Sequence, residues 1–225
     1  MLTRCVPILS VEQLDKLKNS HVCVFGVGGV GGFVCEAIAR IGVSKMTIVD
    51  MDTVNLTNIN RQIIALHSTI GKKKVDVMKE RILDINPNCE VECFDVFVSN
   101  ENIDMFDFNK YNYVIDCVDN VTAKLAIITK AKENNIPVIS SMGTGNKLNP
   151  MKFEIKDISK TTVCPLAKVV RLELRKRNIK NVKVLFSTEE PVKSVDYISS
   201  VSFVPSVAGL LIAREVILDI TKIEV

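Results

Sequence analysis

One stretch decides the fold of this chain: Val22-Cys23-Val24-Phe25-Gly26-Val27-Gly28-Gly29-Val30-Gly31-Gly32. Its apolar run ends at Gly26 and leads into a glycine-rich turn, and a helix-like segment follows. Gly26, Gly28 and Gly31 fill the G-x-G-x-x-G template. A second apolar run is closed by Asp50, at about the 20-residue distance of a ribose-binding acid. This order of strand, glycine loop, helix, strand and acid predicts a nucleotide-binding site.

Each glycine of this loop has a physical reason to lack a side chain. One permits the tight turn, one lets a phosphate approach the backbone, and one lets the helix pack close to the strand. Gly28, Gly29 and Gly31 are expected to bring the backbone to the phosphates. The N-terminus of the following helix offers unpaired N–H groups and a partial positive charge. The motif does not choose among NAD, FAD, S-adenosylmethionine and ATP, and a turn without a ligand is the structural alternative.

The composition is that of an ordinary globular protein. The chain has 225 residues, of which 47% are hydrophobic and 24% charged, and this is enough for one large α/β domain. It contains neither internal repeats nor low-complexity linkers, so we expect a single domain over residues 1–225. The net charge of +3 permits contact with nucleic acid without requiring it.

The cysteines indicate a reducing compartment. There are seven of them, an odd and scattered set without a C-x-x-C pair. This argues for free thiols, and against a disulfide framework or a four-cysteine zinc site. The first ten residues have no sustained apolar run, and no segment reaches the roughly 18 apolar residues of a membrane span. We therefore expect a cytoplasmic protein.

Strand-like and helix-like segments alternate with short links, which is typical of a doubly wound α/β fold. We expect strands at 22–25, 46–49, 90–94, 113–120 and 137–141, and helices at 11–19, 33–40, 75–86 and 122–134. After Pro150 we expect strands at 151–155 and 182–186, helices at 164–177 and 205–220, and a mobile loop at 187–200. The predicted fold class is α/β: a three-layer, doubly wound, mostly parallel, Rossmann-like sheet with antiparallel strands added in the C-terminal third.

The polar residues near the strand ends favour ATP over NAD. The candidate set comprises the glycine loop, Asp50, Asn58 with Arg61 and Gln62, Lys74, Asp119-Asn120, and Arg4. Adenylate formation needs cations on the β- and γ-phosphates, a magnesium ligand and an acid on the ribose. Arg61 and Lys74 can supply the cations, Asp119 can bind Mg²⁺, and Asp50 can hold the ribose. A hydride-transfer enzyme needs no such cationic set.

Each of these residues also has a structural interpretation. Asp119 follows an apolar strand and could instead cap the next helix. Lys74 stands in a run of three lysines that could be a solvated helix start. Asp52 is either the cap of its loop or a ligand of the nucleotide or metal. Cys164 precedes Pro165, where a helix-capping cysteine is the alternative to a thioester-forming one.

The motifs resemble a known family. Residues 50–62, Gly71-Lys72-Lys73-Lys74 and Asp116-Cys117-Val118-Asp119-Asn120 are similar to the ThiF/MoeB adenylyltransferases, which are related to ubiquitin-activating enzymes. This resemblance implies ATP-dependent adenylation of a carboxylate with release of pyrophosphate. It implies that Asp50 holds the ribose, that Asn58, Arg61 and Lys74 contact the phosphates, and that Asp119 binds magnesium. It also implies a homodimer, in which Arg4 reaches the partner subunit's triphosphate.

The later motifs are similar to one branch of that family. Residues 141–150, 157–161, 164–167, 186–191 and 202–206 resemble the dehydratases that modify threonylcarbamoyladenosine in tRNA. The implied substrate is the carboxylate of the threonylcarbamoyl group on adenosine 37, which is adenylated and then attacked by the neighbouring carbamoyl group. The alternative is an adenylyltransferase that activates the C-terminal Gly-Gly of a ubiquitin-like sulfur carrier. A cysteine desulfurase or sulfur acceptor is a further possible partner.

A basic helix face is the candidate contact with tRNA. Lys168, Arg171 and Arg175 lie on one face of the helix expected at 164–177. A solvated basic face is the default interpretation of such a pattern. The implied tRNA substrate makes phosphate contact an equal alternative.

Overall fold

The computed structural model describes residues 2–192 and 198–224. Its centre is a seven-stranded sheet with the order β3-β2-β1-β4-β5-β7-β6. Every neighbouring pair is parallel except β6 and β7, which are antiparallel. The strands are β1 (His21–Phe25), β2 (Lys45–Val49), β3 (Glu90–Phe94), β4 (Tyr113–Asp116), β5 (Val138–Ser141), β6 (Phe153–Asp157) and β7 (Lys183–Ser187).

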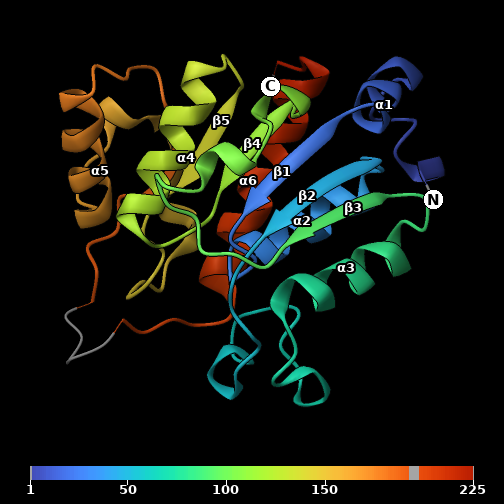
Figure 1. The fold of residues 1–225 in the computed structure, drawn as a ribbon, viewed down its shortest axis with the longest axis horizontal. Coiled ribbons are helices and arrows are strands. Elements are labelled where there is room, and N and C mark those ends of the chain that lie inside the picture. Colours follow the sequence, from blue (N-terminus) through green and yellow to red (C-terminus); the bar gives the residue numbers. More distant parts are fainter. Residues whose placement is uncertain (1, 193–197, 225) are drawn as a thin grey trace.

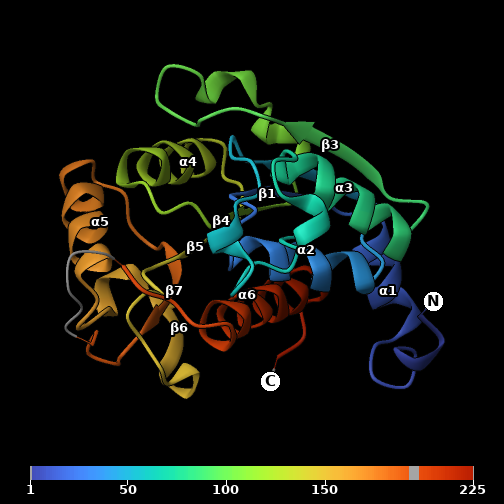
Figure 2. The same ribbon diagram turned by 90° about the horizontal axis from the view of Figure 1, so that it is seen from below.

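Helices cover both faces of this sheet (Figures 1 and 2). They are α1 (Val11–Lys18), α2 (Gly31–Arg40), α3 (Lys74–Ile85), α4 (Val121–Glu133), α5 (Pro165–Lys176) and α6 (Phe203–Thr221). Successive residues of a strand point to opposite faces. In β1, Val22 and Val24 pack with α1, α2, α3 and α6, while Cys23 and Phe25 pack with α4 and residues 94–111. Three layers result.

The predicted fold class is confirmed, and the predicted helices and strands recur, most of them with boundaries shifted by one or two residues. Strand β6 begins at Phe153 rather than at residue 151, because Pro150–Lys152 form a 3₁₀ turn capped by Asn149. Strand β7 is parallel to β5, so β6 is the single antiparallel strand among the described residues. The loop expected at 187–200 includes residues 193–197, which lie outside the described residues.

Helix α6 packs closely against the glycine-rich turn. A Cβ atom on Gly209 of α6 would lie 2.4 Å from the carbonyl oxygen of Val30 and 2.9 Å from Phe33 Cβ. Glycine is therefore required at 209 for α6 and α2 to approach this closely. Pro205, in the first turn of α6, would meet a Cβ on Gly29 at 3.2 Å. One end of α6 thus forms a wall of the predicted nucleotide site.

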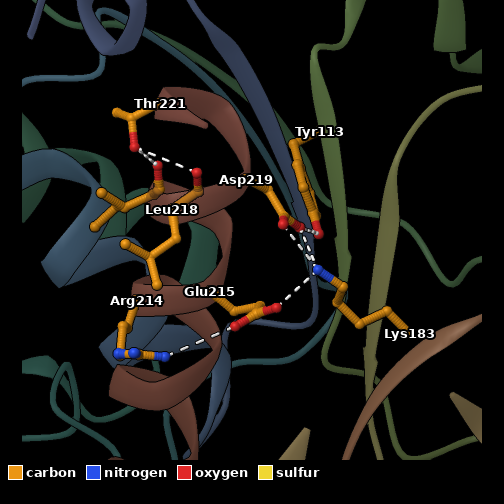
Figure 3. A network of polar contacts seen from close by, with 8 residues as sticks. Tyr113, Lys183, Arg214, Glu215, Leu218, Asp219 and Thr221 are labelled. Carbon is orange, nitrogen blue, oxygen red and sulfur yellow. Dashed lines mark hydrogen bonds and ion pairs between the residues drawn. The ribbon is translucent and has the colours of Figure 1, made fainter. Parts of the chain in front are cut away.

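The other end of α6 is fixed by polar contacts at the amino edge of the sheet (Figure 3). Tyr113, the first residue of β4, donates a 2.6 Å hydrogen bond to Asp219. Lys183, the first residue of β7, donates to Asp219 and to Glu215, each at 2.7 Å. Burial and the neighbouring carboxylate of Asp219 raise the pKa of Tyr113 well above its usual value, so its hydroxyl stays a donor. These bonds hold α6 to the two strands.

Among the described residues, no helix combines the length and the apolar character that crossing a membrane would require.

Candidate nucleotide-binding site

The glycine-rich turn has the geometry of a phosphate loop. Gly26 has φ +88°, a conformation that side-chain-bearing residues rarely adopt, and its N–H donates to Val49 O at 2.7 Å. A Cβ on Gly31 would lie 1.8 Å from the carbonyl oxygen of Gly26, so α2 starts this close only with glycine. Val30, the N-cap residue of α2, makes no side-chain cap. The N–H groups of Gly32 and Phe33 donate to Gly28 O and Val30 O, whereas those of Gly28, Gly29, Val30 and Gly31 have no hydrogen bond to a described residue and can bind an anion.

Asp50 lies beside this loop at the carboxyl end of β2. Its carboxylate accepts the N–H of Val27 at 2.6 Å and that of Asp52 at 2.9 Å. Burial raises the pKa of Asp50, and Lys74, 4.0 Å away, acts in the opposite direction. The two backbone bonds fix the carboxylate against the glycine loop, where a ribose hydroxyl can reach it.

Lys74 brings a positive charge to the same edge. It is the first residue of α3, and its side chain is 6% exposed. Its Nζ atom lies 2.6 Å from Asp52 Oδ2, and its backbone N–H donates to Asp52 O. The alternative of a solvated helix start is therefore wrong for Lys74, although it fits the exposed Lys72 and Lys73.

The loop between β2 and α3 brings Arg61 to the glycine-rich turn. It projects at the bottom of Figure 1, at the carboxyl edge of the sheet. Arg61 Cγ would lie 3.5 Å from a Cβ on Gly29, and Arg61 Nη1 donates to Thr57 O and Asn60 Oδ1, both at 2.9 Å. Asn58 accepts the N–H of Asn55 with its side-chain oxygen, so it shapes the loop. The guanidinium of Arg61 is therefore held by its own loop, beside the turn where phosphates would bind.

Asp119 and Asn120 lie in the loop after β4, at the same carboxyl edge of the sheet as the glycine-rich turn. Asn120 caps α4, because its Oδ1 accepts the N–H of Ala123 at 3.0 Å. The capping role that was the alternative for Asp119 therefore belongs to Asn120. The carboxylate of Asp119 is exposed and has no hydrogen bond or ion pair with any described residue, which leaves both oxygens open to a cation.

A cation at Asp119 would need ligands beyond the protein. No cluster of three or more histidine, cysteine, aspartate or glutamate side chains in the described part of the chain could hold a metal ion. Magnesium is commonly bound by one or two carboxylates, substrate phosphates and water. A single exposed carboxylate across from a phosphate loop fits that coordination.

Some predicted residues lie away from this edge. Arg4 is in a short 3₁₀ turn, Leu2–Arg4, and Leu2 packs on Gly42 at the amino edge of the sheet. The structure therefore does not bring Arg4 to the nucleotide site of its own chain. Cys164 is buried, and its Sγ would lie 3.6 Å from a Cβ on Gly143, so it packs beneath that loop.

The basic residues of α5 differ from one another. Lys168 and Arg175 are exposed, on a helix at the outer side of the molecule (Figure 1). Arg171 is half-buried and donates to the carbonyl and hydroxyl oxygens of Thr161. Arg171 thus ties α5 to the preceding turn, whereas Lys168 and Arg175 present their charges to solvent.

Two buried polar residues lie near the site: Gln62, which belongs to the candidate set but had no role of its own, and Lys124, which the sequence did not single out. Gln62 is 7% exposed, and its Oε1 has no partner among the described residues. Its Nε2 would lie 3.8 Å from a Cβ on Gly28. Lys124 of α4 is fully buried beside Asp116. The signal for Lys124 was its charge on an otherwise apolar helix face, where Ala123, Ile127 and Ile128 are buried as well.

The site combines a glycine loop, the buried Asp50 at the end of β2, and Lys74 and Arg61 at the same edge of the sheet. These features define a nucleotide-binding protein with a doubly wound α/β fold. Comparison of the sequence with known families identifies the class of nucleotide-binding protein. This chain belongs to the ThiF family, whose family model matches residues 2–224.

Individual relatives match over nearly the whole chain. A tRNA threonylcarbamoyladenosine dehydratase of Bacillus subtilis (strain 168) is 46% identical over 230 residues, which cover 94% of this chain and 91% of that protein. E. coli tRNA N6-threonylcarbamoyladenosine dehydratase, TcdA, has been solved in complex with AMP and with ATP. Both structures are 34% identical and cover 96% of this chain and 92% of theirs, with TM-scores of 0.92 (AMP) and 0.91 (ATP).

Proposed function

We propose that this chain is an ATP-dependent tRNA threonylcarbamoyladenosine dehydratase, which cyclises N6-threonylcarbamoyladenosine at position 37 of tRNA. The observation that carries the proposal is the nearly end-to-end similarity to the Bacillus subtilis relative of that name. The similarity to TcdA in complex with ATP supports the choice of nucleotide. We further propose that residues 1–225 act as one ATP-binding adenylation domain.

The first chemical step adenylates the substrate. The threonylcarbamoyl carboxylate attacks the α-phosphate of ATP, a new C–O–P bond forms, and pyrophosphate leaves. Asp50 orients the ribose, the backbone of Gly28, Gly29 and Gly31 receives the phosphates, and Gly26 forms the tight turn that precedes them. Arg61 and Lys74 offset the negative charge that builds up on the β- and γ-phosphates. For this, Lys74 exchanges its present contact with Asp52 for one with phosphate, and Asp52 and Asn58 hold the loop around it.

Asp119 is assigned as the protein ligand of a magnesium ion. Its exposed carboxylate and the adjacent cap residue Asn120 stand at the same sheet edge as the phosphate loop, and oxygen is the donor that Mg²⁺ prefers. When bound, the ion would neutralise phosphate charge and favour departure of pyrophosphate.

The second step closes a ring within the substrate. The carbamoyl group attacks the activated carbonyl carbon, the bond to the AMP oxygen breaks, and AMP leaves. The net loss from the nucleoside is one molecule of water. Because the nucleophile belongs to the substrate, this step needs no enzyme thiol. Burial raises the pKa of Cys117, a cysteine that packs against the glycine loop, which agrees with an unreactive thiol.

Partners follow from the proposed substrate. Lys168 and Arg175 of α5, with Arg171 behind them, are proposed to contact tRNA phosphates. A homodimer would bring Arg4 of each subunit to the other subunit's triphosphate. An enzyme with a tRNA substrate would act in the cytoplasm, where the seven cysteines, all unpaired here, would stay reduced. A cysteine desulfurase or sulfur acceptor stays a prediction.

The decisive experiment supplies ATP, magnesium and tRNA that carries the threonylcarbamoyl mark. Mass spectrometry of the digested nucleosides should show the modified adenosine lighter by one water, and AMP should form in equal amount. Lys74→Met should abolish both products, because the buried ammonium at the phosphate edge is removed. Intact nucleoside with the wild-type protein, together with adenylation of a carrier protein ending in Gly-Gly, would instead establish the sulfur-carrier alternative.

A further inference from the structure

A buried ion pair lies directly behind the loop that carries Asp119. Lys124, in the first turn of α4, and Asp116, the last residue of β4, have fully buried side chains, with Lys124 Nζ 3.1 Å from Asp116 Oδ2. Lys124 also donates to Ser141 O at 2.7 Å and lies 3.4 Å from Ser140 Oγ. The hydroxyl of Ser140 donates to Asp116. The ammonium thus has three acceptors for its three N–H groups.

Asp116 also shapes the loop that follows it. Its Oδ1 accepts the N–H of Val118 at 3.1 Å, which turns the chain two residues after the strand ends. This turn rests on the glycine loop, because a Cβ on Gly26 would lie 2.9 Å from the carbonyl atoms of Cys117. At its other end the loop is fixed where Asn120 caps α4. The carboxylate of Asp119 is therefore carried by a loop fixed at both ends.

Stability alone does not explain why this buried pair is charged. Removing two charges from water is costly, and apolar side chains of similar volume often fill a core equally well. A fully bonded polar network, however, permits one arrangement of the groups that it joins. This network joins the carboxyl ends of β4 and β5 to the start of α4. Figure 2 shows these three elements next to one another.

We propose that Lys124 and Asp116 are positioning residues of the nucleotide site. Their ion pair fixes residues 117–120 so that Asp119 meets the cation bound with the triphosphate. The inference rests on the proposed function, in which Asp119 is the magnesium ligand. Neither Lys124 nor Asp116 touches the nucleotide, and both act through the loop.

The test replaces the pair as a unit. The double variant Asp116→Asn/Lys124→Met is uncharged and similar in volume, and the introduced amide oxygen can still accept the N–H of Val118. The variant should melt within a few degrees of the wild type, while its affinity for ATP with magnesium, measured by calorimetry, falls about tenfold. Affinity for ATP in EDTA should change less than about twofold, because only the cation contact is displaced. Unchanged affinity for magnesium-ATP in the folded variant would overturn the proposal.

A matched control removes another ion pair from the same helix. Lys130 of α4 pairs with Asp104 at the surface. The variant Asp104→Asn/Lys130→Met makes the same chemical changes away from the loop, and it should leave both affinities unchanged. An equal loss of affinity in this control would show that α4 responds to any charge removal, which contradicts a positioning role.

A double-mutant cycle separates positioning from general destabilisation. Asp119→Asn should weaken binding of magnesium-ATP about tenfold in the wild type, but less than about twofold in the Asp116→Asn/Lys124→Met background. Full additivity of the two effects would refute the coupling.

Ser140→Ala provides a milder variant if the double variant does not fold. It removes one hydroxyl from the network and should weaken magnesium-ATP binding about threefold, and no change would count against the proposal. All of these measurements omit tRNA. Failure of the proposed dehydration would therefore leave the result on positioning intact, and the reverse also holds.

Discussion

Gly28 and Gly31 belong to one motif but differ in role, because one faces open space and the other faces backbone. A Cβ on Gly28 would meet no atom closer than 3.8 Å, and its φ is not in the left-handed region. A Cβ on Gly31 would overlap the Gly26 carbonyl oxygen. We therefore expect Gly28 to be needed for ligand binding and Gly31 to be needed for the packing of the fold.

Alanine substitutions should show this difference. Gly28→Ala should keep the melting temperature within about 2 °C and weaken ATP binding about tenfold or more, since its methyl group occupies the phosphate approach. Gly31→Ala should lower the melting temperature by about 6 °C or more through overpacking. Thermal melts and calorimetry measure both effects. A Gly28→Ala protein that binds ATP normally would remove the loop from the phosphate site.

For Gln62 we predict a substitution that raises the melting temperature. A buried amide oxygen without a partner costs about 1–3 kcal/mol, so Gln62→Met should stabilise the ligand-free protein. The expected rise in melting temperature is about 2–4 °C for each kcal/mol. Gln13, the only other glutamine of the chain, accepts the N–H of Ser10 in a capping box, so Gln13→Met should lower the melting temperature slightly. A fall in both variants would show that Gln62 is satisfied in solution.

The residues of the candidate site were accessible from sequence where a motif fixes both type and spacing. Asp50, Lys74 and Arg61 follow such a motif, and the structure brings all three to one edge of the sheet. Lys124 was missed because a lysine in an amphipathic helix is normally solvated. Its place on an apolar helix face was the one sequence signal, and its contacts with Asp116 and Ser141 show that it is buried. The helix cap that was the alternative role for Asp119 is Asn120, since adjacent polar residues share the same local signal.

At the scale of elements, sequence patterns predicted those helices and strands whose ends carry capping residues or proline. Ser10 and Gln13 form a capping box at the start of α1, and α3 ends before Pro87. What local patterns could not supply is pairing between distant segments. The parallel pairing of β7 with β5, and the covering of β1 by residues 94–111, depend on contacts across the whole chain.

Helix α5 carries the prediction for tRNA. The double variant Lys168→Glu/Arg175→Glu should weaken tRNA binding and reduce the salt slope of log K by about one for each phosphate that the protein no longer neutralises. ATP binding should not change, because both side chains are exposed on a helix away from the glycine loop. Filter binding at several salt concentrations measures the slope.

Two comparisons make that result specific. Lys16→Glu/Lys18→Glu on α1 changes the net charge equally and should leave tRNA binding much closer to normal. Arg171→Glu should instead reduce stability, because Arg171 donates to Thr161. Equal losses of tRNA binding from α1 and α5 would indicate a general charge effect rather than a contact face.

At the scale of the whole molecule, the distance of Arg4 from its own site calls for a test in trans. Arg4→Ala and Lys74→Met should each be inactive in AMP formation. If Arg4 serves the partner subunit, subunits mixed and exchanged at equal amounts should recover about a quarter of wild-type activity, because half of the dimers have one complete site of two. A mixture that stays inactive while its mass shows dimers would place Arg4 outside the reaction.

The packing of α6 on the glycine loop also has a consequence for synthesis. The ribosome synthesises residues 22–50 long before residues 203–221. Pro205 and Gly209, however, form the surface on which the glycine loop packs. A nascent chain that ends near residue 200 would have the complete nucleotide motif without the surface that shapes it. Nucleotide binding is therefore acquired late in translation, after most of the parallel sheet can already form.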